Sequence, residues 1–225
     1  MKHSPLSMRW AAAAAWMIPW LALVAYAADE QPGLTPEQAW QRLKDGNERF
    51  AADRLEGKNV GAARRKELAA GQRPFAVVLS CADSRVPPEI IFDQGLGELF
   101  VVRVAGNVSE PFVLGSIDYA VEHLHVPLIV VLGHEKCGAV AAALAPSKPA
   151  GNLGRLIGEI DVGENLPAGK DEALAEAVRN NVRHQAQLLS EHSDVIRAHA
   201  QQTKLRIVAG VYGLASGKVQ WLDVK

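Results

Sequence analysis

The sequence has few cysteines, no excess of basic residues and no repetitive segments. Only Cys81 and Cys137 occur among 225 residues, and there is no internal repeat and no Gln/Asn-, Ser/Thr- or Pro-rich tract. The 24 Lys and Arg side chains are balanced by 25 Asp and Glu and form no dominant basic stripe. Nucleic acid and anionic membrane surfaces are therefore not expected partners. What remains is the composition of a globular protein, long enough for one domain with a sizeable core.

The longest uncharged apolar run lies near the N-terminus, at residues 10–24, after the basic Lys2 and Arg9. It is shorter than the ~20 residues that a membrane-spanning helix needs. An Ala-x-Ala cleavage pattern ends at Ala27. We expect a secretory signal peptide over residues 1–27, cleaved near Ala27, with a retained anchor as the alternative. The mature protein would then be exported to the periplasm, without stable membrane association.

Export affects how the two cysteines are interpreted. Oxidising compartments favour disulfides, so a non-catalytic exported domain with a Cys81–Cys137 disulfide is one hypothesis. Cleavage removes two of the 24 basic residues, which leaves 22 basic and 25 acidic side chains and a net charge of −3. A short linker over residues 28–34 is expected to lead into a single domain over residues 35–225.

Beyond residue 35, continuous apolar runs alternate with segments of helical periodicity. Apolar strands separated by helices are typical of a parallel sheet that is covered on both faces. We therefore predict an α/β fold: a mostly parallel central β-sheet flanked by helices, with an N-terminal helical arm and an antiparallel C-terminal edge strand. Helices are expected over residues 35–53, 61–70, 89–92, 111–123, 139–144, 153–160, 171–190 and 194–202. Strands are expected over residues 75–80, 99–104, 126–133, 205–212 and 218–223.

Two short polar motifs come at the ends of predicted strands. The first, SCADSR, occupies residues 80–85, and the second, HEKCGA, occupies residues 134–139. Ligands of open parallel sheets bind at the carboxyl ends of the strands. The cysteines of the two motifs are therefore expected at the same edge of the sheet, although they are 56 positions apart.

Four side chains of these motifs have the chemistry of a zinc site: Cys81, Asp83, His134 and Cys137. Thiolate, imidazole and carboxylate are the usual ligands of Zn²⁺, in tetrahedral geometry, and each motif offers two of them from one turn. The spacing favours a metal site over the disulfide, and it leaves both open.

Arg85 lies two positions after Asp83, where it can form a bidentate pair with the carboxylate. If this pair holds, Asp83 stays away from the metal and a fourth coordination position is open to water. If the pair breaks, Asp83 can close the site, whereas catalytic zinc sites keep an open position. The alternative is a surface ion pair worth ~0–1 kcal/mol.

Four motifs together resemble those of the β-class carbonic anhydrases: CADSR, VVRVAGN at residues 101–107, GSIDYAV at 115–121, and HEKCGA. The resemblance extends over residues 35–224. It implies a zinc-dependent lyase that reversibly hydrates carbon dioxide to bicarbonate and a proton, by attack of zinc-bound hydroxide on CO₂. It also implies the fold predicted above.

The resemblance assigns roles to the candidate residues one by one. It implies one Zn²⁺ per subunit, held by Cys81, His134 and Cys137, with Asp83 as a ligand only in a closed state. Asp83 and Arg85 correspond to the catalytic dyad. Relatives with the same zinc site hydrolyse CS₂ or COS, and such a hydrolase is the alternative enzymatic function.

The resemblance also implies a substrate site that is shared between subunits. Gln72 corresponds to a glutamine that binds substrate in the neighbouring subunit and marks members that stay open near neutral pH without strong inhibition by bicarbonate. A homodimer or homotetramer is therefore expected, with the N-terminal helix lying over the partner through Trp40 and Phe50. Four further residues correspond to positions that line the pocket or allow close backbone approach: Phe100, Ala105, Tyr119 and Gly138.

Overall fold

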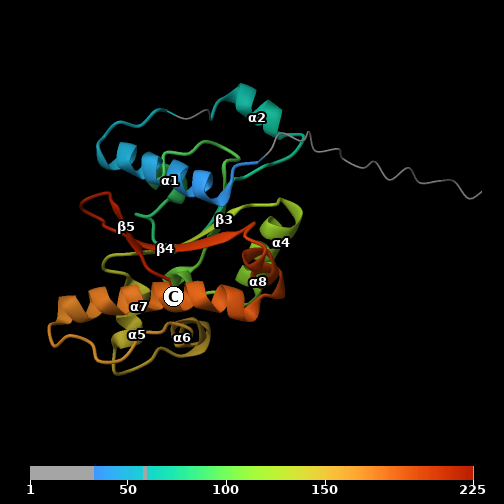
Figure 1. Cartoon of the computed structure of the whole chain (residues 1–225). Helices are drawn as coiled ribbons and strands as arrows, with labels where there is room; N and C mark the ends of the chain where they lie inside the picture. The colour runs from blue at the N-terminus through green and yellow to red at the C-terminus, as the bar shows by residue number, and fades with distance from the viewer. Residues whose placement is uncertain (1–32, 58–59, 225) are drawn as a thin grey trace, which may run out of the picture. The chain divides into compact units, whose positions relative to one another are not determined.

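A five-stranded sheet with the strand order β2-β1-β3-β4-β5 lies at the centre of the fold (Figure 1). The structure is a computed structural model that describes residues 33–57 and 60–224. Neighbouring strands from β2 to β4 pair in parallel, and β5 pairs with β4 antiparallel. The predicted α/β fold is confirmed. The strands are β1 (Ala76–Ser80), β2 (Leu99–Arg103), β3 (Leu128–His134), β4 (Arg206–Tyr212) and β5 (Val219–Leu222).

Helices cover both faces of this sheet (Figure 1). One face carries α1 (Pro36–Ala51), and the other carries α7 (Lys170–His192) with α4 (Pro111–His123) and α8 (Asp194–Gln201). All residues of β1 and β3 are buried, as expected of central parallel strands. The remaining elements are α2 (Ala62–Leu68), α3 (Pro88–Ile91), the 3₁₀ turn η1 (Ala105–Asn107), α5 (Gly138–Leu144) and α6 (Gly151–Gly158).

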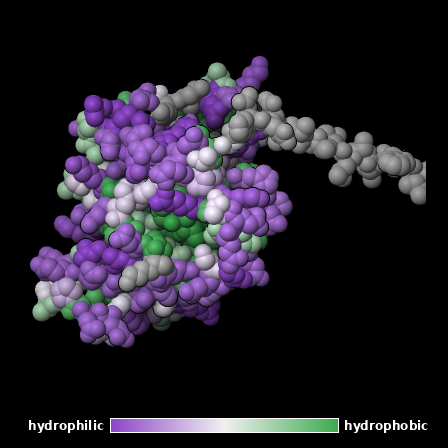
Figure 2. Space-filling model, in the orientation of Figure 1, coloured by the Kyte–Doolittle hydropathy of each residue, from purple (hydrophilic) through white to green (hydrophobic). Residues whose placement is uncertain are grey.

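The view in Figure 2 shows a small hydrophobic patch between β4 and α7, within a face that is otherwise mostly hydrophilic. Partly buried side chains such as Ile207, Val211 and Leu222 pack against the core. No helix in residues 33–57 and 60–224 has the length and apolar character needed to cross a membrane. The predicted signal peptide over residues 1–27, and most of the predicted linker, lie outside the described residues.

The predicted element boundaries differ from the observed ones by at most two residues. The third strand begins at Leu128 and not at residue 126, because Pro127 has no N–H to donate to the sheet. The carbonyl of Pro127 still accepts a hydrogen bond from Arg206 N.

The sequence of α1 suits both its start and its close packing. Thr35 and Gln38 form a reciprocal capping box at its N-terminus. Leu43 is fully buried on the sheet. One turn on, Gly46 allows the helix to touch the backbone after α3, because a Cβ there would lie 1.9 Å from Phe92 O.

The aromatic residues of α1 pack within their own chain. Trp40 makes an edge-to-face contact with Trp221 of β5, with ring centroids 5.9 Å apart. Phe50 lies 6.4 Å from the ring of Tyr212. These contacts arise because α1 lies directly on one face of its own sheet and buries its apolar face there. Both side chains are only partly buried, and their expected contact with a partner subunit stays a prediction.

Asn47 ties α1 to the C-terminal hairpin, and its loss is expected to destabilise the fold. Its Nδ2 donates to the carbonyls of Ile91 (3.2 Å) and Gly217 (2.8 Å), and its Oδ1 accepts from Val219 N (2.8 Å). Asn47→Ala leaves these buried groups unpaired and is expected to lower the free energy of unfolding by about 2–4 kcal/mol in urea titrations. Gln41→Ala, on the exposed face of α1, is the control and should change it by less than about 0.5 kcal/mol.

Candidate metal centre

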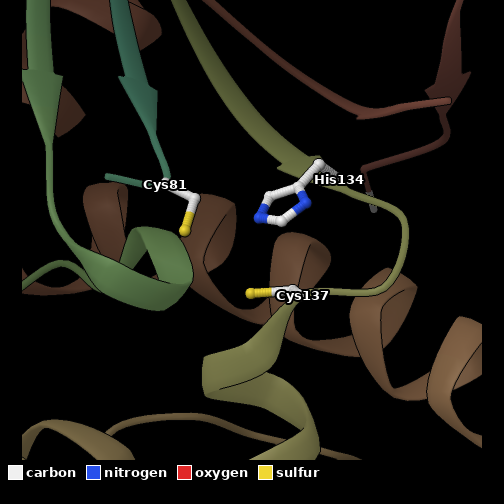
Figure 3. A group of neighbouring side chains, drawn as sticks. All are labelled: Cys81, His134 and Cys137. Carbon is white, nitrogen blue, oxygen red and sulfur yellow. The ribbon is translucent and has the colours of Figure 1, made fainter. Parts of the chain in front are cut away.

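Cys81, His134 and Cys137 meet at the carboxyl edge of the sheet (Figure 3). Cys81 follows β1, His134 ends the adjacent strand β3, and Cys137 is the residue before α5. Their ligand atoms all lie within 4.8 Å of one another, and the residues are 4%, 1% and 2% exposed. The expected convergence of the two motifs is confirmed. Both cysteines are free thiols, and no disulfide joins them.

A hydrogen bond from Nδ1 orients the ring of His134. Nδ1 lies 2.9 Å from the carbonyl oxygen of Glu135 and donates to it. This bond places the lone pair on Nε2, which is buried and has no hydrogen-bond partner among the described residues. A metal-ligating histidine typically has this arrangement, with its second nitrogen bound to a carbonyl. Figure 3 shows the sulfurs and the ring of His134 turned toward one another.

The two sulfurs interact directly. A hydrogen bond from Cys137 lowers the pKa of Cys81, and the Gly106 N–H adds to this effect, against burial, which raises it. The contact with Cys81, followed by burial, raises the pKa of Cys137. Without a cation nearby, the second thiol is therefore harder to ionise than the first. A divalent ion between them would favour both thiolates.

Two thiols and one imidazole with a free lone pair are a donor set that fits Zn²⁺. The three residues are buried, so the ion would be shielded from water except through a fourth position. The donor set is one short of the four that structural zinc sites use, which is typical of catalytic sites.

Asp83 and Arg85 form the expected bidentate pair beside this cluster. Arg85 Nε donates to Asp83 Oδ1 at 2.9 Å, and Nη2 donates to Oδ2 at 2.7 Å. The side-chain hydrogen bonds from Arg85 hold the pKa of Asp83 well below its usual range. Asp83 Oδ2 lies 3.9 Å from His134 Nε2, so the carboxylate borders the space that a metal would occupy.

Comparisons with known proteins agree with these motifs. A sequence model of the family described as carbonic anhydrase matches residues 76–219. Carbonic anhydrase 2 of Mycobacterium tuberculosis is 44% identical over 197 residues, which cover 85% of this chain and 95% of that protein. The carbonic anhydrase of Mycolicibacterium smegmatis is 43% identical, with coverages of 84% and 94%.

Solved structures place the fold in the same class. A β-carbonic anhydrase of Aspergillus fumigatus superposes with a TM-score of 0.65 at 27% identity, over 84% of this chain and 91% of that one. The β-carbonic anhydrase of Coccomyxa, in complex with acetazolamide, gives 0.67 at 28% identity, over 79% and 83%. The chain belongs to the β-class carbonic anhydrase family. It is therefore an enzyme, and the general reaction of its family is the hydration of CO₂.

The structure of this carbonic anhydrase separates the predicted substrate-binding residues into two groups. Ala105 is the first residue of η1, and the second, Gly106, contacts Cys81. Gly138 directly follows Cys137. A Cβ on Gly138 would meet nothing within 4 Å. The missing side chain thus leaves open space next to a cysteine of the cluster. The expected role of Gly138 in close backbone approach to the site stays a prediction.

The second group lies away from the metal centre within one chain. Gln72 is exposed and precedes the amino end of β1, whereas Cys81 follows its carboxyl end, beyond a five-residue strand of roughly 16 Å. Phe100 lies on the edge strand β2 and pairs with Val77 near the amino end of β1, and its ring lies 6.4 Å from that of Tyr119. Gln72, Phe100 and Tyr119 therefore do not contribute to the site of their own subunit.

Sequence reasoning did not assign a role to Arg103 or Gly106. Arg103 Nε donates to Cys81 O at 3.1 Å, and its Nη2 donates to Asp83 O at 2.6 Å. Gly106 N donates to Cys81 Sγ at 3.4 Å. Both belong to the VVRVAGN motif, which begins in β2, the strand adjacent to β1, and continues past its carboxyl end. That adjacency is the signal from which their place at the site could have been expected.

Proposed function

We propose that this carbonic anhydrase catalyses the reversible hydration of CO₂ to bicarbonate and a proton with one zinc ion per subunit, held by Cys81, His134 and Cys137. The observation that carries the proposal is the buried set of three donors in which His134 Nε2 has no hydrogen-bond partner in the described chain. When bound, zinc lowers the pKa of a coordinated water and supplies a nucleophile near neutral pH. Two thiolate ligands weaken this effect relative to a site of three histidines, so we expect activity to increase toward alkaline pH.

Asp83 orients the nucleophile in this proposal. Arg85 donates to both carboxylate oxygens, and the Arg85 backbone N–H donates to Oδ1 at 2.9 Å. The carboxylate is thereby ionised and held in one orientation at the edge of the cluster. Oδ2 accepts only one of these bonds, so it keeps a lone pair that can accept a hydrogen bond from the nucleophile and so fix the direction of the attacking lone pair.

A second subunit completes the substrate pocket in this proposal. CO₂ is apolar and needs a small, dry space, which Ala105 and Gly138 can border without filling. Gln72, Phe100 and Tyr119 lie too far from the cluster in their own chain, so a neighbouring subunit would provide them. Phe112 and Tyr119 of α4 are 91% and 48% exposed, which suits a surface covered in a homodimer or homotetramer.

We further propose that the enzyme acts in the periplasm and stays open at neutral pH. Export is supported by the basic, apolar and Ala-x-Ala pattern of residues 1–27. The open state is supported by the Asp83–Arg85 pair, which keeps the carboxylate bound to the guanidinium. Sigmoidal loss of activity with increasing bicarbonate would contradict the open state.

The function is tested by measuring zinc, free thiols and CO₂ hydration on one preparation. We expect one zinc per chain, two thiols after denaturation without reductant, and kcat/KM in the range of about 10⁴–10⁸ M⁻¹s⁻¹ in stopped-flow assays. A preparation with no zinc and no free thiol would instead support the disulfide-linked, non-catalytic domain. Sulfide release from CS₂ or COS without CO₂ hydration would show that the alternative hydrolase is correct.

A further inference from the structure

A chain of buried amides connects helix α7 to the sulfur of Cys81. It begins at Ser109, whose backbone N–H and hydroxyl each donate to Gln185 Oε1 at 2.7 Å. Gln185 Nε2 donates to Asn181 Oδ1 at 3.4 Å, and Asn181 Nδ2 donates to Gly106 O at 2.8 Å. The Gly106 N–H completes the chain at Cys81 Sγ, 3.4 Å away. Asn181 and Gln185 are both 0% exposed, so bulk water does not compete for their bonds.

Gly106 has no side chain to restrict its backbone, so its conformation depends on contacts with neighbouring residues. Its φ is 74°, and Asn107 follows with a φ of 47°, so the chain passes through two left-handed residues in a row. Ile160 confines Gly106 from one direction, because a Cβ on the glycine would lie 2.7 Å from Ile160 Cδ1. Asn181 holds its carbonyl from α7. The position of the Gly106 N–H beside the sulfur therefore depends on both neighbours.

A buried asparagine such as Asn181 would be an unfavourable choice inside a helix if its only role were to support the fold. A buried amide needs partners for its donors and its acceptor, and leaving a partner unmade is unfavourable. An aliphatic residue would fill the same space next to Val178 and Val182, which share this buried face of α7. The amide does something that an aliphatic side chain cannot: it donates to the carbonyl of Gly106, the residue whose own N–H reaches the sulfur of Cys81.

We infer that Asn181 is a positioning residue for the metal centre, which acts through Gly106 on the Cys81 thiolate. The inference rests on the proposed zinc site. An N–H donor at a thiolate fixes the direction of the sulfur lone pairs and withdraws electron density from them. Loss of the Asn181 donor should release the Gly106 N–H, make the sulfur more electron-rich and leave it less well oriented. Partners of metal ligands typically contribute 10–100-fold to metal affinity or activity.

The test compares three variants of the full chain in zinc and cobalt forms. Asn181→Leu removes the amide, and Asn181→Asp removes only the donor while it keeps the acceptor for Gln185. In both we expect the thiolate-to-cobalt charge-transfer band to move to longer wavelength and zinc affinity in chelator competition to fall about 10-fold. Asn180→Leu is the matched control, because Asn180 Nδ2 also donates to a backbone carbonyl, that of Val162 at 3.1 Å, away from the cluster.

The position of the cobalt band decides the outcome, because general destabilisation does not shift it. The melting temperatures of the metal-free variants report the purely structural cost, and Asn181→Ser replaces any variant that does not fold. If both Asn181 variants keep the wild-type band and zinc affinity, the residue supports only the fold and the inference is wrong. If the wild-type protein itself binds neither zinc nor cobalt, the proposed function fails first, which is a separate result.

Discussion

Replacing His134 by alanine is expected to abolish zinc retention and nearly all CO₂ hydration. His134 is 1% exposed, and its Nε2 is the only non-sulfur donor of the three-residue cluster. Without it, two sulfurs remain, which cannot complete a tetrahedral site. Activity should fall by more than about 100-fold. That factor is the upper end of the loss caused by removing a residue that only hydrogen-bonds to a metal ligand, and His134 is itself a proposed ligand. Zinc per chain, measured after dialysis against a chelator, should fall from one to near zero.

A control histidine separates loss of the ligand from a general effect of the substitution. His184 lies on α7, and its ring is 3.7 Å from a carboxylate oxygen of Asp161, away from the cluster. His184→Ala should keep zinc and activity close to wild type. Cys137→Ala should reproduce the His134 result, because it also removes one of the three donors. Full zinc occupancy in His134→Ala would show that the cluster is not the metal site.

The metal cluster could be predicted from sequence because a parallel sheet places its strand ends in one row. Cys81 and His134 are separated by 53 positions, but each marks the end of a strand, and β1 and β3 are neighbours. Their meeting therefore follows from the alternation of strands and helices. The Asp83–Arg85 pair could be predicted for a different reason: two residues apart in one turn, the side chains need no tertiary information to meet.

The adjacency of β1 and β2 could place Arg103 and Gly106 near the cluster, but their contacts could not be predicted, because these depend on how a turn folds back. The roles of Arg103 and Gly106 follow from the path of the chain after β2, where Gly106 takes a φ of 74°. Sequence periodicity does not encode this path. The packing of Trp40 could not be predicted for a related reason. An aromatic residue on an N-terminal helix can contact a partner or its own sheet, and the structure shows its contact with Trp221 of the same chain.

Asp83→Ala is expected to retain zinc and lose about 100-fold or more of the CO₂ hydration rate. Asp83 is not among the three clustered donors, so metal binding does not depend on it. Its carboxylate lies 3.9 Å from His134 Nε2, close enough to orient a nucleophile at the cluster, and positioned proton acceptors typically contribute 10²–10⁴-fold. Zinc content and stopped-flow kcat should be measured on the same sample. A variant with full zinc and a full rate would show that Asp83 does not orient the nucleophile.

Arg85, the other residue of the dyad, determines how the ionisation of Asp83 depends on pH. Arg85 lowers the pKa of Asp83, so the pair stabilises the fold above the unfolded carboxyl pKa of about 4, and this contribution is lost as pH falls through the still lower folded value. Asp83 therefore stays ionised from pH 6 to 9, and a change of activity in that range does not come from its titration.

Arg85→Ala frees an ionised carboxylate beside the cluster, so turnover should fall at least about 10-fold with zinc retained. Arg85→Lys keeps the charge but loses the bidentate geometry, and full activity in that variant would mean that charge alone holds the carboxylate.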